Sequence, residues 1–255
     1  MLGYFFRHYD RFVDRYFIYD NQSDDGSLEL LAEHPRVTII PLHLEGDSYI
    51  MSSFEQVNQL WHKSRGEADW VTVVNIDEFL WHPDMPWYLR KAREAGITFM
   101  SATGFQMVSD SFPAPDDDLP RSHRFGMRLD RFDKPAFFNP DAIRESNFKM
   151  ARHGSKPRGN VVRPAKDEIL LLHYKFLGRD YLEQRHAELN ARRRSGDVAN
   201  EWGFHYDPEK TRADFEEVRR QRRTVVPRWP LAARLARRFA GSPVAVEPQR
   251  RQRNS

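Results

Sequence analysis

The sequence contains no cysteine among its 255 residues. Disulfides, thiolate metal sites and a cysteine nucleophile are therefore excluded, which is consistent with a reducing compartment. No apolar run approaches the length of about 20 residues that a membrane-spanning helix needs. The opening residues, MLGYFFRHYDRF, lack the basic start and apolar stretch of a secretory signal. We therefore expect a cytoplasmic protein.

Acidic residues are scarce relative to basic ones in the C-terminal part of the chain. Residues 185–255 hold 17 Lys+Arg against 9 Asp+Glu, whereas residues 1–184 hold 23 against 28. Hydrophobic residues make up 40% and aromatic residues 13%, which suffices for a substantial core. We expect one domain over residues 1–195, a basic helical extension over 196–246 and a disordered tail over 247–255.

Short apolar runs alternate with amphipathic segments through most of the chain. The expected strands are residues 15–19, 36–41, 70–74, 97–107 and 168–173, and the expected helices are residues 27–33, 53–65, 86–95 and 179–194. Strand–helix–strand units of this length predict an α/β fold, namely a mostly parallel sheet with helices on both faces.

Two polar loops follow expected strands and would lie at the same edge of that sheet. Ligands of parallel sheets bind beyond the carboxyl ends of the strands. The loop at residues 20–26 is rich in Asp, Asn and Ser, so Asp20 would accept hydrogen bonds from a ribose or a base. The alternative is a turn whose side chains satisfy their own backbone, which is the usual fate of such residues.

The second loop, at residues 75–78, carries two adjacent carboxylates. Mg²⁺ and Mn²⁺ prefer oxygen ligands and usually share them with a phosphate substrate. Asp77 and Glu78 would supply such oxygens, and Asn75 would lie on the same strand face as Asp77. The alternative is a solvated strand end, where an Asp-Glu pair is ordinary.

Three segments in order resemble glycosyltransferases of families 2 and 92, which have the GT-A fold. They read FVDRYFIYDNQSDDGSLELL, then ADWVTVVNIDEFLW, and then LLLHYKFLGRDYLEQR. The resemblance covers about residues 1–190. It implies a GT-A-like sheet and a metal-binding D-x-D motif that falls on Asn75-Ile76-Asp77. Asn75 stands where the motif has its first Asp.

The resemblance also implies the site residues and the cofactor. The cofactor would be a divalent cation, Mn²⁺ or Mg²⁺, held by Asp77, Glu78 and His173. The nucleotide-sugar donor would bind at Asp20, Asn21, Ser23, Asp25, Asn75 and Lys175. Lys175 would offset the charge of the leaving diphosphate. For His173 taken alone, a half-buried structural histidine is the simpler interpretation.

The function implied is metal-dependent, inverting transfer of a sugar from a nucleotide-diphosphate donor to a glycan or lipid-linked acceptor, as in polysaccharide biosynthesis. The alternative is a truncated or non-catalytic relative that binds a carbohydrate or a partner. Asn75 favours that alternative, and so does the family's first strand, which would precede Met1.

Inverting transfer needs a carboxylate that takes the proton of the acceptor hydroxyl. Asp110 follows an expected strand and is our candidate, ahead of Glu145; residues 116–118 form an expected exposed loop. Lys134, His153 and Lys156 would flank the acceptor side or would simply solvate a loop.

Residues 229–241, WPLAARLARRFAG, predict an amphipathic helix. Leu231, Leu235 and Phe239 share one face, and the arginines point mostly elsewhere. Such a helix can lie on the anionic inner face of a membrane or dock on its own domain. Nucleic-acid binding ranks last, since no recognisable nucleic-acid module accompanies it, and we expect none.

Overall fold

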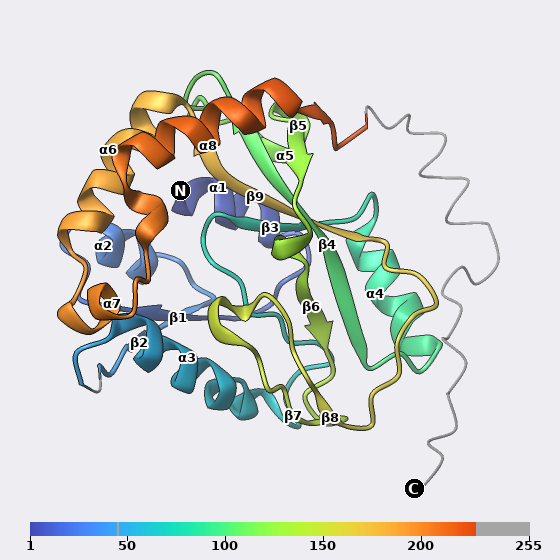
Figure 1. Cartoon of the computed structure of the whole chain (residues 1–255). Helices are drawn as coiled ribbons and strands as arrows, with labels where there is room; N and C mark the ends of the chain where they lie inside the picture. The colour runs from blue at the N-terminus through green and yellow to red at the C-terminus, as the bar shows by residue number, and fades with distance from the viewer. Residues whose placement is uncertain (45, 228–255) are drawn as a thin grey trace, which may run out of the picture.

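The computed structural model describes residues 1–44 and 46–227, which form a mixed α/β fold (Figure 1). The helices are α1 (Leu2–Tyr9), α2 (Ser27–Ala32), α3 (Tyr49–Leu60), α4 (Met85–Glu94), α5 (Leu119–Ser122), α6 (Arg179–Ala191), α7 (Ser195–Ala199) and α8 (Pro208–Gln221), with 3₁₀ turns η1 (Trp61–Ser64), η2 (Asp130–Phe132), η3 (Met150–Arg152) and η4 (Phe204–Tyr206). The amphipathic segment expected at 229–241 and the tail expected at 247–255 lie outside the described residues.

The strands form one large sheet and two small ones. They are β1 (Tyr16–Asp20), β2 (Val37–Pro41), β3 (Glu78–Trp81), β4 (Phe99–Ser109), β5 (Phe125–Arg128), β6 (Lys134–Phe138), β7 (Ile143–Glu145), β8 (Arg158–Gly159), β9 (Ile169–Leu177) and β10 (Arg223–Thr224). The large sheet has the order β10-β5-β4-β9-β3, and β6 also pairs with β4. β1 pairs with β2, and β7 with β8.

The prediction of a mostly parallel sheet is wrong for the large sheet. Only β4 and β9 pair in parallel there, while β3 with β9, β5 with β4, β6 with β4 and β10 with β5 are antiparallel. β9 enters between β3 and β4, the two strands that flank α4 along the chain. A hydrophobic run predicts that a strand is buried, but it does not reveal the direction of its neighbours. The small β1–β2 sheet is parallel, as expected.

The strand expected at residues 70–74 also differs. Within it, Val71 forms one isolated antiparallel bridge with Phe138, and the regular strand β3 begins at Glu78 instead. The apolar residues of the run are still used for packing, since Val71 and Val73 lie against the buried cluster around Trp61. The acidic motif therefore precedes a strand rather than following one.

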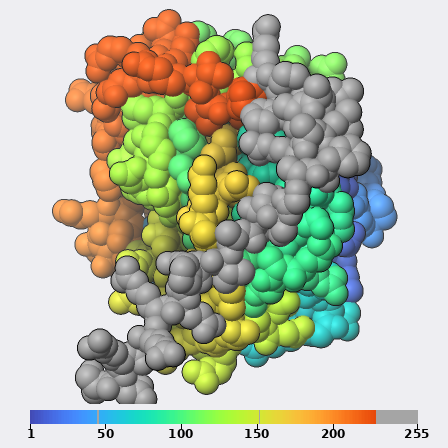
Figure 2. All heavy atoms as spheres, turned by 90° about the vertical axis from the view of Figure 1, so that its right-hand side faces the viewer, coloured from blue at the N-terminus to red at the C-terminus, as the bar shows by residue number. Residues whose placement is uncertain are grey.

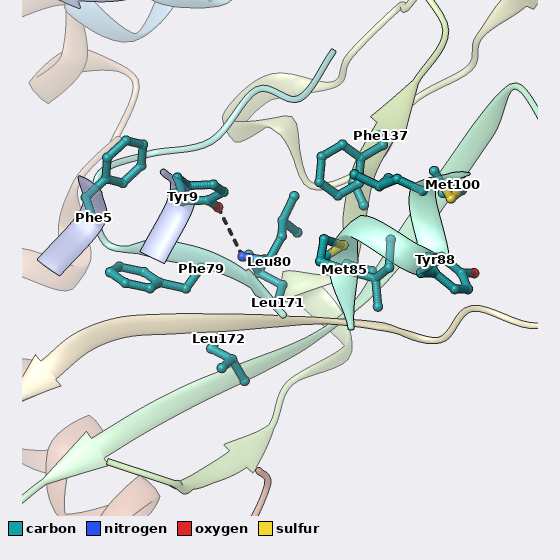
Figure 3. Close-up of a cluster of buried hydrophobic side chains, with 14 of the residues drawn as sticks. Phe5, Tyr9, Phe79, Leu80, Met85, Tyr88, Met100, Phe137, Leu171 and Leu172 are labelled. Carbon is teal, nitrogen blue, oxygen red and sulfur yellow. Dashed lines mark hydrogen bonds between the residues drawn. The ribbon is translucent and has the colours of Figure 1, made fainter. Parts of the chain in front are cut away.

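The main core lies where α1, α4, β3 and β9 meet. Figure 3 shows Phe5 and Tyr9 of α1 beside Phe79 and Leu80 of β3. The Tyr9 hydroxyl accepts a hydrogen bond from the Leu80 N–H at 3.0 Å and donates one to the Glu78 carbonyl at 2.8 Å. Helix α1 thus fixes the start of β3, directly beside the acidic motif.

A second apolar cluster attaches the C-terminal helices to the sheet. Phe215 and Val218 of α8 pack with Leu182 of α6, Val108 of β4 and Phe176 of β9. In Figure 1, α6 and α8 lie together on the side of the sheet away from α4. Viewed from the α4 side, α8 runs along the top of the molecule and α4 lies below it (Figure 2). Helix α8, which follows residue 195, therefore packs on the same sheet as the residues before it.

The helices within residues 1–44 and 46–227 include none with the length and apolar character needed to cross a bilayer.

Gly104, in the middle of β4, has no space for a side chain. A Cβ atom there would lie 2.4 Å from the carbonyl carbon and 2.5 Å from the Cβ of Phe132. We expect Gly104→Ala to lower the free energy of unfolding by roughly 1–3 kcal/mol, because backbone must move to relieve the overlap. The urea midpoint of unfolding measures this. Gly3→Ala is the control, since nothing lies within 4 Å of a Cβ there. Equal midpoints for the two variants would contradict the expectation.

Candidate functional site

A cleft of about 2420 Å³ opens between β1, the segment at residues 70–78, β9 and α6. Single-ligand pockets usually measure about 300–1,000 Å³, so this cleft has room for more than one ligand. Nine of the ten site residues predicted from the sequence line it, namely Asp20, Asn21, Ser23, Asp25, Asn75, Asp77, Glu78, His173 and Lys175. The tenth, Asp110, is not among the described residues that line the cleft.

The acidic motif forms a tight turn before β3. The Glu78 N–H donates to the Asn75 carbonyl at 3.0 Å, and the Asn75 N–H donates to the Glu78 carboxylate at 2.7 Å. The Tyr174 N–H of β9 donates to the Asp77 carbonyl at 2.7 Å. The backbone on both sides of the Asp77 side chain is therefore fixed.

Glu78 forms a buried ion pair. Its carboxylate lies 2.7 Å from the Lys134 ammonium of β6, and both side chains are 1% exposed. Burial works to raise the pKa of Glu78, but the charges of Lys134, Arg152 and His173 together outweigh it and hold the pKa below its ordinary value. The same oxygen, Oε2, accepts from Lys134 and from the Asn75 N–H. Glu78 thus anchors the turn, although the sequence suggested it as a metal ligand.

Asp77 and His173 face each other. The Asp77 Oδ2 lies 3.4 Å from the His173 Nε2, and the two side chains are 25% and 13% exposed. Burial works to raise the pKa of Asp77, but His173 and then Lys175 outweigh it, so the pKa lies well below its ordinary range. The other ring nitrogen of His173, Nδ1, lies 2.9 Å from the Gln106 Oε1. Asp77 is therefore an ionised carboxylate beside a fixed imidazole.

Lys175 follows His173 by two residues in β9, so both side chains project to the same side of the strand. Its ammonium lies 4.8 Å from the centre of the Tyr206 ring. Burial lowers the pKa of Lys175, and the Asp77 charge opposes this effect. A half-buried cation therefore lies on the same face of β9 as His173.

These residues fit a divalent cation that shares its ligands with a substrate. Asp77 and His173 place an oxygen and a nitrogen ligand side by side. Across residues 1–44 and 46–227, no group of three or more His, Asp or Glu side chains could hold a metal ion. Mg²⁺ typically takes one or two carboxylates and completes its coordination with water and phosphate oxygens. A site with two protein ligands matches that pattern.

The loop at residues 20–26 lines the same cleft, but the carboxylates of Asp20 and Asp25 accept hydrogen bonds from the backbone of their own turns. The Asp20 carboxylate accepts from the Ser23 N–H at 3.2 Å. The Asp25 carboxylate accepts from the Ser27 N–H at 3.1 Å, at the start of α2. This is the arrangement that the sequence left open as the alternative. Asn21 is exposed at the tip of the loop.

Two further residues, Arg152 and His153, lie beside the acidic turn. Arg152 was absent from the sequence prediction, and His153 had only a minor role in it. The Arg152 guanidinium donates to the Asn75 side-chain oxygen. His153 stacks on Phe132 at 5.3 Å between ring centres, and burial lowers the pKa of His153 to about 4. Arg152 lies 77 residues from Asn75, so no local spacing indicates the contact.

Asp110, the expected catalytic base, directly follows β4 and contacts the C-terminal end of α8. Its carboxylate forms ion pairs with Arg219 at 2.6 Å and Arg222 at 3.1 Å. The hydrogen bond from Arg219 lowers the pKa of Asp110, which makes it a weaker base. The alternative candidate, Glu145, lies opposite Arg158 in the strand pairing of β7 with β8. The described cleft lining includes neither the Asp110 nor the Glu145 carboxylate.

The model of glycosyltransferase family 92 matches residues 2–177. The match runs from α1 to the end of β9 and so contains the acidic turn, His173 and Lys175. No curated protein matches the chain.

Removal of Lys134 tests the anchor of the turn. Lys134→Met leaves the Glu78 carboxylate buried without its cation, and we expect a loss of about 3–5 kcal/mol in the free energy of unfolding. The double variant Lys134→Met/Glu78→Gln should lose less than the single one, because no charge is then stranded. Urea unfolding measures both, and a larger loss in the double variant would contradict the pairing.

The pH dependence of that loss has a definite sign. In the wild type, folding lowers the pKa of Glu78. The ionised carboxylate therefore stabilises the fold at neutral pH, and this contribution declines as the pH falls below the pKa that Glu78 has in the unfolded chain. In Lys134→Met, burial raises this pKa and only the weaker effects of Arg152 and His173 oppose it. Protonation of Glu78 would therefore remove the unpaired charge and lessen the destabilisation of the variant. The stability gap between the two proteins should therefore narrow between neutral pH and about pH 4.

Proposed function

The chain belongs to glycosyltransferase family 92, and its activity is therefore a glycosyl transfer; on this premise we propose a nucleotide-diphosphate sugar as the donor and a glycan or lipid-linked molecule as the acceptor. We further propose that transfer depends on Mn²⁺ or Mg²⁺. The observation that carries the proposal is the Asp77–His173 pair with Lys175 beside it, in one cleft.

The charges of this site suit a diphosphate leaving group. A divalent cation bound by Asp77 and His173 would stabilise the negative charge that develops on the departing diphosphate. Lys175 lies on the same face of β9 and would contact the phosphate oxygens directly. Its partial burial strengthens that attraction, because water screens it less. Further cationic side chains line the cleft, among them Arg131, Arg152 and Arg185.

The nucleoside would lie against the loop at residues 20–26, with Asn21 and Ser23 as hydrogen-bonding partners of the ribose or base. Both line the cleft, and the Asn21 side chain is exposed. The remaining cleft volume leaves space for an acceptor. For inverting transfer, the acceptor hydroxyl would attack the anomeric carbon and pass its proton to a carboxylate. Asp110 would have to leave Arg219 and Arg222 to serve as that base.

A non-catalytic carbohydrate-binding relative is the second candidate. Asn75 replaces the first carboxylate of the metal motif, and its side-chain oxygen is engaged by Arg152. This leaves one carboxylate of the turn, Asp77, directed at His173. Measurement of donor binding and donor turnover on the same protein separates the two candidates.

Thermal unfolding with UDP-, GDP- and CMP-sugars, each with and without Mn²⁺, tests the donor and the cation. A matching donor at about 100 times its Kd should stabilise the fold by about 2.7 kcal/mol, and Mn²⁺ should be required for most of that effect. Asp77→Asn should abolish the Mn²⁺-dependent part. Asp130→Asn is the matched control, since the Asp130 side chain is 93% exposed.

The outcomes are distinct. No stabilisation of the wild type by any donor would contradict the donor proposal, and stabilisation by CMP-sugars alone would contradict the diphosphate. Stabilisation without any release of nucleoside diphosphate in the presence of candidate acceptors would favour the non-catalytic relative. An equal loss in Asp130→Asn would show that the effect does not report on the Asp77 site.

A further inference from the structure

Gln106 is a buried amide behind the candidate cation site. It lies in β4, directly opposite His173 of the parallel neighbour β9, and is 1% exposed. Its amide nitrogen lies 2.9 Å from the His173 carbonyl oxygen and 2.9 Å from the Met107 carbonyl oxygen. Its amide oxygen lies 2.9 Å from the Nδ1 of the His173 ring. One side chain therefore holds both the backbone and the ring of His173.

The chemistry of these contacts fixes which atoms donate. Carbonyl oxygens only accept hydrogen bonds, so the Gln106 NH₂ group must face the two carbonyls. Its oxygen then faces the ring, and this oxygen also only accepts. Nδ1 of His173 must therefore carry the hydrogen. In the neutral imidazole only one nitrogen is protonated, so Nε2 is left with a lone pair.

The pairing of β4 with β9 is irregular at this point. The register of β4 and β9 shifts between Gln106 and Val108, which pair with His173 and Phe176 respectively. Two steps along β4 thus correspond to three along β9, which is a bulge. Within the bulge, the Tyr174 N–H turns to the Asp77 carbonyl, 2.7 Å away. Bulges next to active sites commonly re-aim a side chain.

The Nε2 atom of His173 faces a carboxylate. Nε2 lies 3.4 Å from the Asp77 Oδ2, and Phe132 packs against the ring with 4.8 Å between ring centres. Without a cation, a proton on Nε2 would be donated to Asp77. When Nε2 carries no proton, its lone pair and the Asp77 carboxylate form a pair of ligands, so one cation can take the place of that proton.

We propose that Gln106 is a positioning residue, which holds His173 as the Nδ1–H tautomer so that Nε2 and Asp77 together bind one divalent cation. The cation part rests on the proposed function, whereas the tautomer part does not. Partners of this kind typically change metal affinity by about 10- to 100-fold when they are removed.

The test reads the tautomer directly, without metal or donor. Nitrogen-15 NMR of the histidine side chains, at a pH near 8.5 where a typical imidazole is neutral, distinguishes Nδ1–H from Nε2–H. The His173 signals are assigned by their loss in His173→Asn. We expect Nδ1–H in the wild type, and a shift toward Nε2–H in Gln106→Met, which keeps the length but lacks the acceptor. Gln184→Met is the control, since Gln184 is exposed on α6.

Binding of Mn²⁺ alone supplies the second readout. We expect the Kd for Mn²⁺ to rise by about 10- to 100-fold in Gln106→Met and to stay unchanged in Gln184→Met. Gln106→Glu should keep the Nδ1–H tautomer, because a carboxylate oxygen also accepts from Nδ1. Retention of the tautomer and of tight Mn²⁺ binding in Gln106→Met would overturn the inference.

The failures of the two proposals are distinguishable. A neutral ring with its hydrogen on Nε2 in the wild type would overturn the role of Gln106 whatever the protein binds. An Nδ1–H ring in a wild type that binds no Mn²⁺ would leave the positioning of His173 correct and would overturn the cation site. The wild-type spectrum decides the first point even where a variant does not fold.

Discussion

The buried ion pair between Glu78 and Lys134 is the constraint on which the rest of the site depends. Removing two charges from water costs several kcal/mol per ion, and close geometry with further hydrogen bonds is needed to offset that cost. Here the charges lie 2.7 Å apart and the carboxylate also accepts from the Asn75 N–H. The pair joins β6 to β3, and the bond from the Asn75 N–H to the same carboxylate closes the turn that leads into β3. Asp77 therefore projects from a rigid element, which is what a preorganised site requires.

The positions of most elements could be predicted from the sequence, but their pairing could not. Predicted and observed bounds agree within a few residues for β1, α2, β2, α4, β4, β9 and α6. The run at residues 70–74 misled the prediction. Its apolar side chains pack against the core, but its backbone forms only one isolated bridge, between Val71 and Phe138. The direction of β3 follows from β9, which lies about 90 residues further along the chain. A local hydrophobic pattern contains neither fact.

The site, too, could be predicted only in part. The acidic turn and the residues His173 and Lys175 could be proposed from their charged and metal-binding side chains near expected strand ends, and the structure brings them into one cleft. Gln106 has no signal in the sequence, because a glutamine inside a strand acquires its role only from the register with β9. The sequence suggested that Lys134 flanks the acceptor side. In the structure, Lys134 is buried against Glu78, so its role is structural. The roles that sequence reasoning missed are those set by contacts across strands.

The central claim is that Asp77 and His173 jointly hold a divalent cation. Crystals grown with Mn²⁺ and the nucleoside diphosphate of the stabilising donor test it most directly, since anomalous scattering locates manganese independently of any activity. The account predicts one manganese peak within coordination distance of the Asp77 carboxylate and the His173 Nε2, with the remaining ligands supplied by phosphate and water. A nucleotide-bound crystal with its manganese elsewhere, or with an Asp77–His173 hydrogen bond in its place, would contradict the claim.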